Sequence, residues 1–308
     1  MTAVSIGSNL FLLDLHDSGF ERRTGSYVFQ EAKKAIIETS ASPSVPYLLK
    51  GLQELCIQPE EIDYIIVTHI HLDHSGGAGL FLRSCPNAKL IVHPKGARHL
   101  AAPDKLIASA KMVYGEQFGH LFDPIVPVPE ERIMEMEDGG KINLGERELT
   151  FIHTPGHANH HFTIYDQKSN GIFTGDTAGI QYAHLTDEGI PLYMPTTSPN
   201  QFDPEAMKRS IEKIMAFEPE RIYFGHYGMT GHPKQAVDLV LRWLDVYMEE
   251  LQKAETAEGL EKNLMKKVNH YLSEKGVPAS HPVYQLLKID LQVSAQGMIH
   301  YKEKQHSK

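Results

Sequence analysis

Cysteine is scarce in this chain of 308 residues, which contains only Cys56 and Cys85. Two thiols are too few for a disulfide framework, and neither has the paired spacing of a cysteine zinc site. The sequence therefore predicts two reduced, partly buried thiols. Basic residues are also in deficit, with 30 Lys and Arg against 39 Asp and Glu and a net charge of −9. Because an acidic surface repels phosphate backbones, this balance disfavours nucleic-acid binding.

Long hydrophobic runs are also missing from the sequence. No uninterrupted apolar stretch approaches the length of a membrane span, and the first ten residues lack the basic start and apolar core of a secretory signal. We therefore expect a cytoplasmic protein with no membrane association. Hydrophobic residues make up 41% of the chain and charged residues 22%. This balance is ordinary for a globular protein and allows a sizeable core.

Short strands and helices alternate over most of the chain, and a helical tail follows. Ile62 to Thr68 is predicted to be a buried strand, and Asp203 to Phe217 a helix capped by Asp203. Residues 95–124 are expected to be helical and to interrupt the alternation. From about Pro233, apolar residues at helical spacing predict a long amphipathic helix. This order predicts sheets covered by helices, followed by a helical extension.

Histidine is abundant, with 18 residues, and its densest cluster directly follows the strand that ends at Thr68. Four potential metal ligands fall within six residues, namely His69, His71, Asp73 and His74. Alternation along an extended chain places the first two on one side, and a following turn can present the other two to a second point nearby. Imidazole and carboxylate together suit zinc, iron or manganese. The alternative is a solvated polar loop, which this density of ionisable groups disfavours.

Three later segments share a pattern in which a short β stretch ends in a polar residue beside glycine. They contain Gly156-His157, Gly175-Asp176 and Gly225-His226. Each is weak evidence alone, because a histidine after a strand is often a surface or core residue. In this order, after His-x-His-x-Asp-His, they resemble the metallo-β-lactamase superfamily over about residues 4–232.

That resemblance implies an α/β fold, a four-layer αβ/βα sandwich with the metals at one edge of its two sheets. The implied domains are a catalytic domain over 1–232, with a lid-like helical insertion at 95–124, and a helical C-terminal extension over 233–308. The implied cofactor is a pair of divalent metal ions, zinc in the first place, with iron or manganese as alternatives. The ligands carried over by the resemblance are His69, His71 and His157 for the first metal, Asp73, His74 and His226 for the second, and Asp176 bridging both.

Two divalent ions about 3.5–4 Å apart can share a hydroxide and stabilise the oxyanion that forms when it attacks. Asp73 is the predicted catalytic residue, because it could orient the nucleophile or receive a proton. With Asp73 present, the first motif resembles that of the glyoxalase II, lactonase and thioesterase-like branches of the superfamily. We therefore predict hydrolysis of an ester, thioester or lactone of a small molecule. Two alternatives stay open: a persulfide dioxygenase with a single iron, and a non-catalytic metal-binding sensor.

Three residues near the ligands are candidates for substrate binding. Tyr182 and His184 follow Asp176 closely, and Tyr227 follows His226. Simple packing explains Tyr182 equally well. Oligomeric state is open, and a homodimer is one possibility.

The remaining histidines and a basic stretch have less specific interpretations. His161 is read either as support for a ligand or as an ordinary strand residue. We assign His160 to the surface, and His93 and His99 to surface or packing roles. The basic stretch with Lys262, Lys266 and Lys267 could bind an anionic thiol carrier, but a solvated helix face explains it better.

Overall fold

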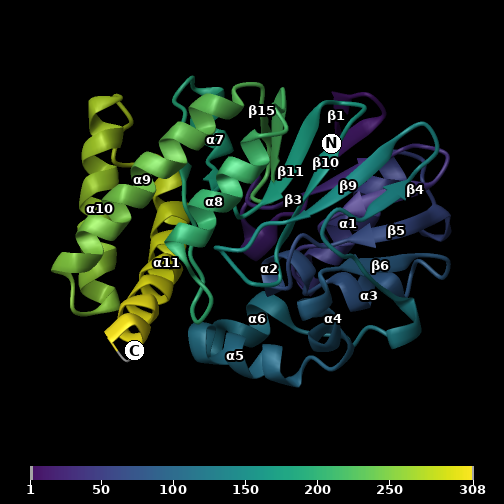
Figure 1. Ribbon diagram of the computed structural model, residues 1–308, viewed down its shortest axis with the longest axis horizontal. Helices are drawn as coiled ribbons and strands as arrows, with labels where there is room; N and C mark the ends of the chain where they lie inside the picture. The colour runs from purple at the N-terminus through teal and green to yellow at the C-terminus, as the bar shows by residue number, and fades with distance from the viewer. Residues whose placement is uncertain (1–2, 307–308) are drawn as a thin grey trace.

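The computed structural model describes residues 3–306, in which two large β-sheets pack face to face (Figure 1). The first sheet has the order β1-β2-β3-β4-β5-β6-β7; its first four strands are antiparallel, and β4 to β7 are parallel. Its strands are β1 (Ala3–Gly7), β2 (Leu10–Asp14), β3 (Gly25–Phe29), β4 (Lys34–Ile37), β5 (Ile62–Ile66), β6 (Lys89–Val92) and β7 (Ile133–Glu135).

The second sheet has the order β15-β14-β11-β10-β9-β8, and its pairs are antiparallel except for β11 with β14. A separate two-stranded ribbon pairs β12 with β13. The strands are β8 (Lys141–Asn143), β9 (Glu148–His153), β10 (Phe162–Asp166), β11 (Gly171–Gly175), β12 (Ile180–Gln181), β13 (Tyr193–Met194), β14 (Arg221–Phe224) and β15 (Met229–Thr230).

Helices cover the outer faces of both sheets, and the last three lie together at one end of the molecule (Figure 1). The α-helices are α1 (Val45–Glu54), α2 (Leu72–Ser75), α3 (Ala78–Leu82), α4 (Pro94–Ala101), α5 (Asp104–Tyr114), α6 (Phe118–Phe122), α7 (Ala183–Asp187), α8 (Pro204–Met215), α9 (Pro233–Lys253), α10 (Ala257–Glu274) and α11 (Val283–His306). Short 3-10 helices are η1 (Asp17–Gly19), η2 (Ser42–Ser44), η3 (Pro59–Glu61), η4 (Gly115–Gln117) and η5 (Glu130–Arg132).

The side chains of the strands alternate between two cores, and this alternation builds the four layers. In β11, Phe173 packs between the sheets, while Ile172 packs outward under α8 and α9. In β4, Ile37 points inward and Ile36 outward toward α1. The result is helix, sheet, sheet, helix, so the predicted αβ/βα sandwich with a helical C-terminal region is confirmed.

Most predicted elements lie close to their expected bounds. Strand β5 begins at Ile62, as expected, and ends at Ile66. Helix α8 begins after Asp203, whose Oδ1 accepts a hydrogen bond from the Ala206 amide at 2.9 Å. The segment 95–124 is helical, as α4, α5, η4 and α6. The turn expected after His71 is the short helix α2, which carries Asp73 and His74.

The division into domains at residues 232 and 233 stays a prediction, as does the lid-like role of 95–124. Residues 1–2 and 307–308 of those predicted domains lie outside the described residues. No helix in the described part of the chain is long and apolar enough to cross a membrane.

Candidate metal centre

The predicted ligands follow the ends of strands in both sheets. His69 comes after β5, Asp176 after β11 and His226 after β14. Because β11 and β14 are parallel neighbours, Asp176 and His226 emerge at the same edge of the second sheet. His157 lies on the connection from β9 to β10. The packing of the two sheets then brings segments far apart in the sequence to one point.

The seven predicted ligands form three overlapping groups whose ligand atoms lie within 4.8 Å of one another. His71 Nδ1 is 2.9 Å from His157 Nε2, and His157 Nε2 is 3.6 Å from Asp176 Oδ2. On the other side, His226 Nε2 lies 3.6 Å from both Asp73 Oδ2 and Asp176 Oδ2. The groups are His69 with His71 and His157, His69 with His74 and Asp176, and Asp73 with His74 and His226.

The donor set fits metal ions. His69 is completely buried, yet its Nε2 makes no hydrogen bond to any described residue, while Thr68 Oγ1 lies 3.0 Å from its Nδ1. A buried imidazole nitrogen without a partner is costly unless a ligand satisfies it. Nitrogen and carboxylate donors converging in this way suit a borderline divalent ion such as Zn²⁺.

The electrostatics divide the histidines into two kinds. Burial, together with neighbouring histidines, lowers the pKa of His69 and of His71 well below the usual range. These two side chains are therefore neutral, the form that coordinates a metal. Burial opposes protonation of His74 as well, but the Asp176, Glu38 and Asp73 carboxylates raise its pKa well above the usual value. A metal ion would take the place of that proton.

The two acidic ligands differ in their access to solvent. The Asp176 side chain is 3% exposed and that of Asp73 is 22% exposed. Despite burial, His74, His226 and His157 hold the pKa of Asp176 well below its usual range. Asp176 therefore stays a carboxylate at the centre of the cluster, and Asp73 is the acid that faces the open side.

Glu38 is a part of the site that sequence reasoning missed. It follows β4, is buried, and its Oε1 lies 3.4 Å from His74 Nδ1. The same carboxylate accepts hydrogen bonds from the Thr68 amide at 3.3 Å and from the Thr68 hydroxyl. Carboxylates of this kind orient metal-bound histidines. Because β4 is parallel to β5, the ends of these neighbouring strands could have pointed to Glu38.

The glycines in the motifs are required by close packing. Gly175 has a φ of +47°, and a Cβ there would lie 2.5 Å from His161 Nε2 and from Thr68 Oγ1. A Cβ on Gly225 would lie 2.8 Å from His74 Cε1. Any larger residue would displace His74 or the side chains that contact His69 and Asp176, which explains why glycine precedes both Asp176 and His226.

Two histidines beside the ligands have well-defined places. His161 is buried and accepts a hydrogen bond from the Asp176 amide at 3.2 Å. This contact agrees with the first of its two interpretations, in which His161 supports a ligand. The surface assignment of His160 is wrong, because it is 5% exposed and accepts a hydrogen bond from the Ile70 amide. The sequence pattern did not reveal that α4 and the first metal-binding segment would cover it.

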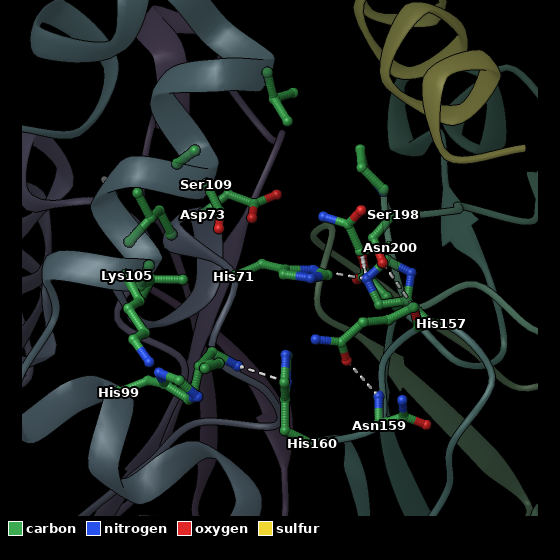
Figure 2. A pocket seen from close by; sticks show the side chains of 18 of the residues that line it. His71, Asp73, His99, Lys105, Ser109, His157, Asn159, His160, Ser198 and Asn200 are labelled. Atoms are coloured by element: carbon green, nitrogen blue, oxygen red, sulfur yellow. Dashed lines mark hydrogen bonds and ion pairs between the residues drawn. The ribbon is translucent and has the colours of Figure 1, made fainter. Parts of the chain in front are cut away.

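A cavity of about 820 Å³ opens on the cluster, and His71, Asp73, His157 and Asp176 are part of its wall. Figure 2 shows His71 and His157 facing each other across its centre, with Lys105 and His99 on one side and Ser198 and Asn200 on the other. The wall also includes apolar side chains and a polar loop, among them Leu72, Leu106, Ala110, Val113, Asn159, Thr196, Thr197, Gln201 and Val293.

The C-terminal helix α11 takes part in this cavity through Val293. The Thr197 hydroxyl donates a hydrogen bond of 2.7 Å to the Ser294 carbonyl, and Ser198 donates one of 2.8 Å to the carbonyl of His157. The loop between β13 and α8 thus connects α11 to a ligand.

The three predicted substrate residues lie away from the cavity wall. Tyr182 is buried and donates a hydrogen bond to Asp290 at 3.0 Å. Tyr227 packs under the Arg22 guanidinium, 5.4 Å from the ring centroid. His184 is half-buried on α7, near the same guanidinium. The structure does not bring these side chains to the cavity, and their substrate role stays a prediction.

Comparison with known proteins identifies the family. The model of the metallo-β-lactamase superfamily matches residues 21–226. The chain therefore belongs to the metallo-β-lactamase superfamily. The crystal structure of ST1585, an archaeal member, covers 94% of this chain and 98% of its own at a TM-score of 0.69 and 22% identity, which supports the fold.

Several curated relatives are similar in sequence over part of their length. The metallo-β-lactamase fold-containing protein ST1585 of Sulfurisphaera tokodaii is 29% identical over 56% of this chain and 63% of its own. Human acyl-coenzyme A thioesterase MBLAC2 is 30% identical over 54% of this chain and 56% of its own. Hydroxyacylglutathione hydrolase of Aeromonas hydrophila is 27% identical over 46% of this chain and 44% of its own. The matches thus span about half of the relatives' lengths, and relatives with hydrolase names support a hydrolase at family level.

Proposed function

We propose that this protein hydrolyses an ester, thioester or lactone of a small molecule at a dinuclear metal centre. The observation that carries the proposal is the pair of three-residue ligand groups on either side of Asp176, both reaching the same cavity. The thioesterase and hydroxyacylglutathione hydrolase among the relatives support a thioester among these three substrate classes. A small-molecule substrate suits a cavity of about 820 Å³.

His69, His71 and His157 would hold the first metal and Asp73, His74 and His226 the second, with Asp176 between them. When bound, two divalent ions acidify water and polarise the carbonyl oxygen of the substrate.

The protein's own residues account for the proton and for orientation. Asp73 lines the cavity and is the more exposed carboxylate of the cluster, so its side chain can receive the proton that hydrolysis releases. His160 also lines the cavity, and burial lowers its pKa to about 3, so the ring is neutral. Because its Nδ1 accepts the Ile70 amide, the ring hydrogen lies on Nε2, which can donate to the bound substrate.

The test is turnover by the metal-loaded protein on a panel of thioesters, lactones and phosphodiesters. Asp176→Asn and His71→Ala should each lower kcat/KM for the best acyl substrate by more than about 100-fold. Mutating residues that only support metal ligands lowers activity by up to about 100-fold, so the loss of a ligand itself should exceed this value. The matched control is His120→Ala, which alters an exposed histidine on α6 and should keep full activity. Circular dichroism checks that the variants stay folded.

The result that contradicts the proposal is full activity in either ligand variant, or turnover of phosphodiesters alone. A possible homodimer and the exclusion of nucleic acid remain predictions, and neither enters this test.

A further inference from the structure

One wall of the cavity carries three cationic side chains, namely Lys95, Arg98 and Lys105. The first two are three residues apart on α4 and so share one face of that helix, and Lys105 is on the neighbouring helix α5. All three are exposed, and none pairs with a carboxylate of residues 3–306. Within the described part of the chain, Arg98 donates to His99 alone, at 3.3 Å.

Two of the three cations, Arg98 and Lys105, act on the same neighbouring side chain. His99, between them, has its pKa lowered by burial and then by the positive charges of Arg98 and Lys105. Figure 2 shows Lys105 and His99 side by side at the edge of the cavity, across from Asn159. The cationic wall, defined here as Lys95, Arg98 and Lys105, is therefore a single region of positive charge.

No acidic side chain within the cavity balances this charge. Its only acidic lining residues are Asp73 and Asp176, both among the ligands that metal ions would neutralise. The whole chain has a net charge of −9. A positive wall beside the reacting centre of an acidic protein attracts anions specifically to that wall.

The rest of the cavity has a different character. Leu106, Ala110 and Val113 on α5 and Val293 of α11 line it and provide apolar surface. A molecule that fills the cavity thus meets apolar side chains and cations as well as the ligand cluster. This favours an amphiphilic substrate with an acyl group at one end and negative charge at the other.

We propose that the cationic wall binds the phosphate-bearing portion of a thiol carrier, so that the substrate is an acyl thioester of a phosphorylated thiol. The inference rests on the proposed thioester hydrolysis and adds the class of leaving group. Phosphate suits the wall because two lysines and one arginine can each contact a separate anionic oxygen.

The basic stretch on α10 is the competing location, and the structure argues against it. Lys262 pairs with Glu258 at 2.6 Å, and Lys267 lies 3.4 Å from Glu250. These lysines are on a helix that contributes no residue to the metal cavity. The cationic wall, by contrast, is unpaired and lies beside the ligands.

The experiment compares two triple variants that remove the same amount of charge. One replaces the cationic wall (Lys95→Gln, Arg98→Gln and Lys105→Gln), and the matched control replaces Lys262, Lys266 and Lys267 by Gln. Each is assayed with hexanoyl-coenzyme A, hexanoyl-glutathione and hexanoyl-N-acetylcysteamine, which carry phosphate, carboxylate and no charge. Binding of adenosine 3′,5′-bisphosphate by isothermal titration calorimetry gives a readout that needs no turnover.

We expect the wall variant to lower kcat/KM for the coenzyme A thioester, relative to the N-acetylcysteamine thioester, by about 10- to 100-fold. It should also weaken bisphosphate binding, and the α10 variant should change neither value more than about 2-fold. An unchanged ratio, an equal loss in the α10 variant, or a loss confined to the glutathione thioester overturns the inference. If the unmodified protein cleaves none of the thioesters, the thioester hydrolysis on which this inference rests fails, and bisphosphate binding still decides whether the wall binds phosphate.

Discussion

The buried ion pairs of Arg23 lead to the sharpest structural prediction. Its Nε lies 3.0 Å from Asp17 Oδ2 and its Nη1 3.0 Å from Asp290 Oδ1, while the Tyr182 hydroxyl donates to the other oxygen of Asp290 at 3.0 Å. The Arg23 and Asp290 side chains are 9% and 10% exposed. This cluster ties the N-terminal hairpin to α11, the helix that brings Val293 to the cavity.

Replacing Asp290 by Ala removes one carboxylate from Arg23 and the acceptor from the Tyr182 hydroxyl. Losing one partner of a buried pair costs about 3–5 kcal/mol, and Asp17 still compensates Arg23, so we expect a loss of about 3 kcal/mol in the free energy of unfolding. With about 2.1 cal/mol/K of unfolding entropy per residue, this lowers Tm by about 5 °C. Asp290→Asn keeps the acceptor and should cost about 1 kcal/mol.

The assay is urea and thermal unfolding followed by circular dichroism. The matched control is Asp245→Ala, an exposed aspartate on α9 whose contact with Lys208 spans 3.3 Å and should be worth less than about 0.5 kcal/mol. If Asp290→Ala cost no more than this control, the reasoning that the buried cluster fastens α11 to the fold would be refuted.

Two further predictions concern Glu38 and His93. Glu38→Gln removes the carboxylate beside His74 and should weaken metal affinity about 10- to 100-fold, as measured by competition with a chelator; unchanged affinity would contradict its role. Burial, followed by His153 and Lys95, lowers the pKa of His93 from 6.5 to about 4, and its Nδ1 accepts the Lys95 amide at 3.0 Å. Folding thus favours the neutral form of His93. The contribution of this group to the free energy of unfolding is present above pH 6.5 and should be lost as the pH falls toward 4. His93→Asn keeps an acceptor without this titration, and the wild type should lose about 1–2 kcal/mol more than the variant over that window, after discounting for partial solvent access; parallel unfolding curves would contradict this.

The convergence of the candidate ligands could be predicted because the sequence signal is local. His69 to His74 are contiguous, and Gly175 and Gly225 mark the close approaches that the two strand ends require. The four layers of the fold could be predicted for a similar reason, because period-2 alternation decides which face of a strand is buried.

The substrate-facing residues could not be predicted in the same way, because they depend on how distant elements pack. Tyr182 follows Asp176 closely in sequence, but its hydroxyl turns to Asp290, which is 108 residues away. Lys95 and Lys105 reach the cavity because α4 and α5 both contribute to its wall. His160 is buried for the same reason, which proximity to His157 in sequence does not reveal.

The most direct test of the account is the metal content of the purified protein, measured per chain together with turnover of a neutral thioester. The account predicts two divalent ions per chain and hydrolysis that disappears in Asp176→Asn as the stoichiometry falls. One iron per chain with oxygen uptake would instead indicate the persulfide dioxygenase alternative. Two ions without turnover of any acyl substrate would indicate a sensor, and either result would contradict the proposed function.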